Sequence, residues 1–143
     1  MEIRLIKKTI VATAIYFIVC INYIYSQDCA EGYTYIDDLP PTATLLDGDA
    51  CLYNVDLQVL NDIITANSLL DYNSEIEVGV QTWNAGRLTG LVARYNPNGA
   101  GGVNAQLTIL PESFGNLTEL YSLYLEWNRI SSLPDSFSQL TKL

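Results

Sequence analysis

The sequence predicts an α/β solenoid, in which short parallel β-strands line a concave face and a helix-containing cap closes the N-terminal end. Three observations support this fold class. A leucine-rich segment recurs at a 23-residue spacing near the C-terminus, an asparagine recurs at one place in a frame of alternating apolar residues, and a stretch of helical spacing precedes these frames. We expect three parts: a signal peptide (1–26), a cap region (27–87) and the repeats (88–143).

The first 26 residues have the layout of a secretory signal peptide. A positively charged start precedes the apolar run 10–21, and Ser26 is a small residue after which cleavage is expected. An uncleaved anchor is the alternative, because the 18 mostly apolar residues of 9–26 reach the lower limit for spanning a bilayer. Cleavage after Ser26 would make the protein secreted or place it at the cell surface.

The cap region contains two cysteines, Cys29 and Cys51. An exported chain meets an oxidising compartment, so this pair predicts a disulfide; two free buried thiols are the alternative. A crosslink of this loop length contributes on the order of 3 kcal/mol through the unfolded state.

A helix is expected from about residue 56 to about residue 66. Leu57, Leu60 and Ile63 lie at helical spacing in VDLQVLNDIITANSLL, and Asp56 is a credible N-cap.

The segment IEVGVQTW follows and alternates through Ile76, Val78 and Val80, which predicts a strand. Trp83 ends this segment. We expect it to be structural, because Trp83 and the helix's apolar face would cover the core edge that the first repeat leaves open.

The repeat is clearest in LPESFGNLTEL (110–120) and LPDSFSQLTKL (133–143), which are 23 residues apart. Between them the chain reads L-x-x-L-x-L-x-x-N from Leu120 to Asn128. An earlier, weaker copy is RLTGLVARYN, which ends at Asn96 and is followed by a nine-residue insertion, 97–105. The sequence therefore holds two frames and the start of a third.

Asn96 and Asn128 are predicted to be structural. Where the chain turns off a strand, its backbone groups lose their ladder partners, and burying them unpaired is costly. An Asn amide both donates and accepts hydrogen bonds, so it can satisfy those groups.

These frames resemble the leucine-rich repeat family, in the class of 23-residue repeats with the pattern LPxxFxxLxxLxxLxLxxN. The order helix, strand, Trp83 and Gly86–Thr89 is loosely similar to the N-terminal cap of plant-type leucine-rich repeat receptors, although here the cysteines lie before the helix. The resemblance implies a curved solenoid. Solenoids need about three or more repeats and a terminal cap, so we expect an N-terminal fragment.

Composition excludes several function classes. The formal net charge of −9 disfavours a nucleic-acid partner, and the absence of His removes imidazole catalysis and His-ligated metal sites. DGDACLYNVDLQ starts like a calcium loop, but Leu52 and Gln58 stand where Gly and Glu are required. GAGG lacks the Lys-Ser/Thr of a phosphate loop. We expect no enzyme, no cofactor and no metal.

The predicted concave face contains the ligand-binding candidates. Period-2 alternation and stacking of the two frames would set Val92 beside Tyr124, Arg94 beside Glu126, and Tyr95 beside Trp127. Exposed aromatics with a charged pair have the composition of interaction hot spots. The candidates are Arg94, Tyr95, Tyr124, Glu126 and Trp127. The alternative is that the aromatics only shield the backbone and Arg94 and Glu126 form a weak surface ion pair.

Non-catalytic recognition through this face is the expected function, with a protein as the first ligand class and a glycan as the second. The insertion 97–105 is rich in Gly and Asn, so we expect a mobile loop, either a side wall of the face or a plain surface loop. Two alternatives are a structural spacer or adhesin module, and the targeting part of an enzyme whose catalytic domain lies beyond residue 143.

Overall fold

The computed structural model of the protein describes residues 28–68 and 72–143. The expected signal peptide, 1–26, lies outside them. The chain divides into two units, Met1–Ala30 and Glu31–Leu143, and every helix and strand of the described residues belongs to the second unit.

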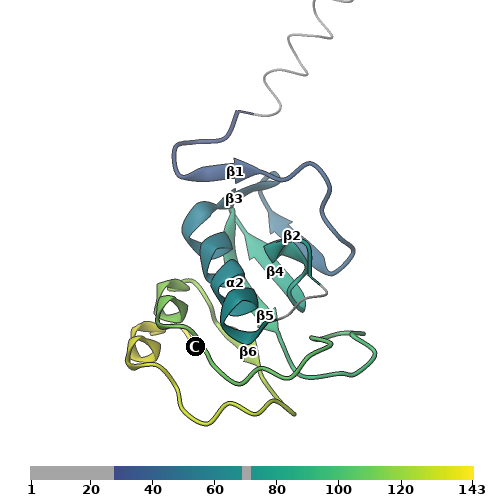
Figure 1. The fold of residues 1–143 in the computed structure, drawn as a ribbon. Coiled ribbons are helices and arrows are strands. Elements are labelled where there is room, and N and C mark those ends of the chain that lie inside the picture. Colours follow the sequence, from purple (N-terminus) through teal and green to yellow (C-terminus); the bar gives the residue numbers. More distant parts are fainter. Residues whose placement is uncertain (1–27, 69–71) are drawn as a thin grey trace, which may run out of the picture. The chain divides into compact units, whose positions relative to one another are not determined.

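Two small β-sheets, one α-helix and three 3-10 turns make up the fold within the described residues (Figure 1). The two-stranded sheet pairs β1 (Tyr33–Tyr35) with β3 (Cys51–Tyr53). The four-stranded sheet has the order β2 (Ala43–Asp47), β4 (Val80–Asn84), β5 (Arg87–Val92), β6 (Ser122–Tyr124). The helical segments are α2 (Asn54–Asn67), η1 (Glu75–Glu77), η2 (Glu112–Asn116) and η3 (Asp135–Gln139).

The larger sheet is mixed, and the predicted solenoid is therefore wrong. β4 and β5 form an antiparallel hairpin, while β2–β4 and β5–β6 are parallel pairs. The chain reverses at Ala85 and Gly86, which both have positive φ, the geometry of a two-residue hairpin turn. The strand of the first frame thus pairs antiparallel with a strand of the cap region, and the result is a compact α/β fold rather than a stack of like units.

The 23-residue recurrence is nevertheless visible in local structure. Phe114 and Phe137 each donate a backbone hydrogen bond to the proline three residues earlier, at 2.9 and 3.0 Å. The two rings stack with centroids 6.0 Å apart, and Gly115 is required between the turns because a Cβ there would meet the Ser136 carbonyl at 2.3 Å. The recurrence therefore produces two packed turns, η2 and η3.

The helix α2 begins two residues before and ends one residue after the expected range. Its N-cap is Tyr53, which makes no side-chain capping bond, so the prediction of Asp56 as the cap is wrong. Asp56 lies inside the helix and is fully buried, because its carboxylate is used across the fold instead.

That carboxylate joins α2 to β5. It accepts hydrogen bonds from the Leu88 backbone N–H at 2.9 Å and from Arg87 Nε and Nη2 at 2.8 and 3.1 Å. The Arg87 guanidinium also lies over the Tyr53 ring, 4.5 Å from its centroid. The hydrogen bond to Asp56 raises the pKa of Arg87 above its usual value, so the guanidinium stays charged.

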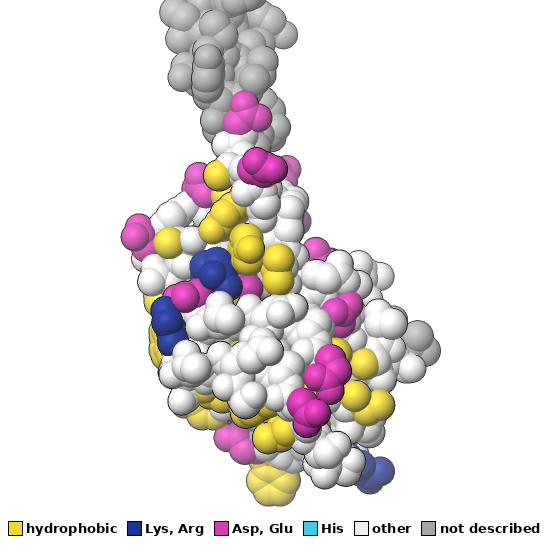
Figure 2. Space-filling view, turned by 90° about the vertical axis from the view of Figure 1, so that its left-hand side faces the viewer, with side chains coloured by type: hydrophobic (Ala, Val, Ile, Leu, Met, Phe, Trp, Pro, Cys, Tyr) yellow, Lys and Arg dark blue, Asp and Glu magenta, His cyan; other side chains and the backbone are white. Residues whose placement is uncertain are grey.

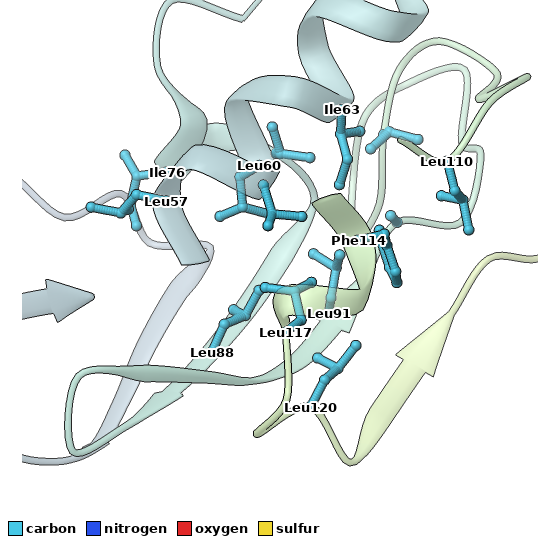
Figure 3. Close-up of a cluster of buried hydrophobic side chains, with 14 of the residues drawn as sticks. Leu57, Leu60, Ile63, Ile76, Leu88, Leu91, Leu110, Phe114, Leu117 and Leu120 are labelled. Atoms are coloured by element: carbon cyan, nitrogen blue, oxygen red, sulfur yellow. The ribbon is translucent and has the colours of Figure 1, made fainter. Parts of the chain in front are cut away.

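The apolar core lies between α2, the inner face of the larger sheet and the turn η2 (Figure 3). Side chains from the helix point toward β5 and η2 in this view. The labelled members are Leu57, Leu60, Ile63, Ile76, Leu88, Leu91, Leu110, Phe114, Leu117 and Leu120.

The predicted strand over IEVGVQTW forms only in part. Ile76 lies in η1, and the strand begins at Val80. Trp83 is fully buried in β4, and its indole N–H donates to Gln81 Oε1 at 3.0 Å. Gln81 in turn donates to the carbonyls of Glu75 and Val78, so this network ties the 3-10 turn to the sheet.

The predicted disulfide between Cys29 and Cys51 is confirmed. Within the described residues, no helix is both long enough and apolar enough to cross a membrane.

The buried carboxylate leads to a stability prediction. Asp56→Ala would leave the Leu88 N–H and the Arg87 guanidinium without their partner. We expect a loss of about 3 kcal/mol in the free energy of unfolding, measured by urea denaturation of the oxidised protein. Asp38→Ala, at an exposed turn, is the control. A loss for Asp56→Ala no larger than about 0.5 kcal/mol, the range of ordinary surface substitutions, would contradict the assigned role.

Candidate functional site

The two frames of the repeat meet at the edge of the larger sheet. β6 is the last strand of the sheet order, and Val92 and Tyr124 are cross-strand partners, as the stacking predicted. Beyond the strands the two chain segments stay together, because the Tyr95 N–H donates to the Glu126 carbonyl at 2.9 Å.

Asn128 holds the chain where it leaves β6. Its Nδ2 donates to the carbonyls of Ala93 and Leu125 at 2.8 and 2.9 Å, and its Oδ1 accepts from the Leu107 N–H at 2.9 Å. One amide therefore satisfies backbone groups from three segments that have no sheet ladder there.

Asn96 serves a more local purpose. Its Nδ2 donates to the Ala100 carbonyl at 2.6 Å, and its Oδ1 accepts from the Asn98 N–H at 3.1 Å. It closes the first turn of the insertion rather than bridging the two frames, because the chain beyond it runs into the nine extra residues.

The insertion 97–105 is fastened to the strand end. Val103 is fully buried, its N–H donates to the Arg94 carbonyl at 2.9 Å, and its own carbonyl accepts from the Asn96 N–H at 2.8 Å. Gly102 packs so closely that a Cβ would meet the Arg94 carbonyl at 2.2 Å. These contacts place the insertion as a wall beside the sheet edge.

An open hollow of about 340 Å³ lies between this wall and the turn after β6. We call it the aromatic hollow, and its lining residues are Arg94, Tyr95, Asn96, Pro97 and Trp127. Three of the five residues that the sequence selected are thus brought together. Tyr124 and Glu126 are exposed nearby but do not line it.

Arg94 and Glu126 do not form the ion pair that was the alternative for them. The ion pairs among the described residues are Arg87–Asp56 and Lys142–Glu119. Arg94 instead donates from Nε to the Gly101 carbonyl at 3.0 Å, which fixes its guanidinium against the insertion.

Trp127 is the unusual residue of the site. Its side chain is 78% exposed, and its backbone has φ of +67°, in the left-handed region that bulky residues rarely occupy. Such a conformation costs of the order of 1–3 kcal/mol, and it is held by neighbours on both sides. The Gln106 side chain donates to the Trp127 carbonyl at 2.9 Å. The next residue in the chain, Asn128, is held by the hydrogen bonds of its own side chain.

Sequence reasoning did not select Pro97 or Gln106. Pro97 follows Asn96 in an Asn-Pro-Asn-Gly turn, and this turn was the available signal that the insertion would fold back onto the strand end. Gln106 carried no signal, because its contact with Trp127 spans 21 residues of chain.

The described residues contain no group of three or more His, Cys, Asp or Glu side chains that could hold a metal ion. Acidic side chains are spread over the face shown in Figure 2, with few Lys or Arg side chains among them.

No protein-family model matches the sequence, and no curated protein or solved structure is significantly similar to it.

The strain at Trp127 is open to a direct test. Trp127→Gly and Trp127→Ala both remove the indole, but only glycine adopts positive φ without strain. We expect the glycine variant to be the more stable by about 1 kcal/mol in chemical denaturation. The matched control is Tyr124, on extended backbone in β6, where the order should reverse, with alanine above glycine. Alanine ranking above glycine at both positions would exclude strain at Trp127.

Proposed function

We propose that this chain is a non-catalytic recognition module that binds a protein ligand through the aromatic hollow and the adjoining Tyr124. The observation that supports this most is Trp127, which combines a large exposed apolar surface with an unfavourable backbone conformation. Neither property stabilises the fold, and strained, exposed residues of this kind concentrate at ligand sites.

The composition of the surface favours a protein ligand. Trp, Tyr and Arg are the residues most enriched at the centres of protein interfaces, and Arg94, Tyr95 and Trp127 line one hollow. Tyr124, in the edge strand β6, is 49% exposed and extends this surface along the sheet edge.

Export is part of the proposal. Residues 1–26 would act as the signal peptide, and the Cys29–Cys51 disulfide supports a route through an oxidising compartment, where such bonds form and persist. The two LPxSFxxLTxL copies are the remaining basis for kinship with leucine-rich repeat proteins. That kinship is proposed for these segments only.

The export proposal predicts a defined N-terminus. When the whole gene is expressed in a secreting host, the protein in the medium should begin at Gln27 and contain no free thiol. Intact-mass spectrometry with and without reduction measures both properties. A chain that keeps residues 1–26 and stays with the membrane fraction would instead show an anchor.

The binding proposal predicts the effect of a double substitution. Ligands for the oxidised protein are first selected from a displayed peptide library. Tyr124→Ala combined with Trp127→Ala should weaken their binding by at least about 30-fold, as loss of one hot-spot residue already does. Secretion and the urea midpoint should change little. Tyr121→Ala is the matched control, since Tyr121 is 54% exposed but does not line the hollow. Equal affinity of the double variant and the wild type would refute the proposed surface.

A further inference from the structure

The polar atoms that the aromatic hollow offers are mainly donors. Arg94 and the Trp127 indole have N–H groups and no acceptor. Arg94 uses Nε for the Gly101 carbonyl, which leaves its two terminal nitrogens, and the Trp127 indole N–H makes no hydrogen bond with the described residues. Tyr95 adds a hydroxyl.

The one side-chain amide in the lining is already occupied. Asn96 donates to Ala100 and accepts from Asn98, so each end of its amide already makes one hydrogen bond within the insertion. A sugar would bring several hydroxyl groups, each of which needs an acceptor as well as a donor. Among the lining side chains only Tyr95 and Asn96 have acceptor atoms, and this favours a ligand whose own polar groups are mainly acceptors.

A proline-rich segment offers mainly hydrogen-bond acceptors, which complement the donors of the hollow. Proline has no N–H, and the polyproline II helix makes no internal hydrogen bonds, so its carbonyls are free acceptors. Its rings are flat apolar surfaces that fit between aromatic side chains, and grooves lined with aromatics are the recurring way to bind such segments. Trp127, Tyr95 and Pro97 provide a surface of this kind.

Charge points to basic residues beside the prolines. Glu126 is exposed next to Trp127, makes no ion pair within the described part of the chain, and belongs to a protein of net charge −9. Of the lining residues only Arg94 is charged, so the ligand's basic residue would lie outside the lining, at Glu126. Opposite charge on the ligand would speed its approach and fix its direction in the hollow.

We propose that the partner of the aromatic hollow is an extended proline-rich protein segment that carries Lys or Arg beside its prolines. This deepens the proposed function and rests on it. The prolines would stack against Trp127 and Tyr95, the donors of Arg94 and Trp127 would bind the ligand's carbonyls, and its basic residue would lie at Glu126.

The protein carries its own reporter for a test. It has two tryptophans, of which Trp83 is fully buried and Trp127 is 78% exposed, so a shift in emission on ligand addition reports Trp127. The probe is an oligoproline peptide with a lysine at each end, added to the oxidised wild type and to Trp127→Ala.

The expected result is a saturable blue shift for the wild type and none for Trp127→Ala. Replacing every second proline by glycine should weaken binding about tenfold, because the ligand is then no longer preorganised. Exchanging the lysines for glutamates should also weaken it, as should Glu126→Gln with the lysine peptide. Both charge effects should fade at about 1 M salt.

Several results would overturn the inference. One is the absence of a saturable shift with the lysine peptide at millimolar concentration, and another is equal binding of the proline and glycine peptides. Library ligands that need Trp127 but lack proline, or a glycan that binds through Trp127, would overturn it and leave the hollow as a binding site. If no ligand of any kind depends on Trp127, the proposed function fails together with this inference.

Discussion

The fold depends on one buried carboxylate. Asp56 is fully buried, and a charge in that position is tolerated only when its hydrogen bonds are complete. It achieves this with the backbone of Leu88 and the guanidinium of Arg87, both at the start of β5. The helix is thereby set at one position over the sheet. The β4–β5 hairpin pairs a strand of the cap region with one edge of β5, and β6 pairs with the other edge of β5.

Side-chain amides extend this order beyond the sheet. Past β6 the chain has no ladder, yet its backbone groups are still partly enclosed, and Asn128 supplies their partners. Asn67 does the same at the end of α2, where it accepts from Thr108 and Ile109 and donates to the Ile109 carbonyl. The irregular half of the molecule is therefore held in place, which is the condition for a preformed binding surface.

At Trp127 the local preferences of the chain and its final conformation disagree. In the core, apolar spacing and burial agree with one another, as expected of a sequence that specifies one structure. At Trp127 a large apolar residue is exposed on a backbone that favours glycine. Disagreement of this kind is characteristic of functional positions, and Trp127 is one of the residues that line the aromatic hollow.

The sequence by itself determined the local features: the helix, the cysteine pair, the recurring turns, and the neighbours Val92 and Tyr124. The cysteine pair follows from the expected export, and the others follow from spacing within one short segment or between two similar ones. Tertiary structure alone decided the mixed sheet, the inward Asp56 and the aromatic hollow. These depend on which way the chain turns at Ala85–Gly86 and on contacts between distant segments. A periodic pattern shows which side of a strand is apolar, but it does not say which strand lies beside it.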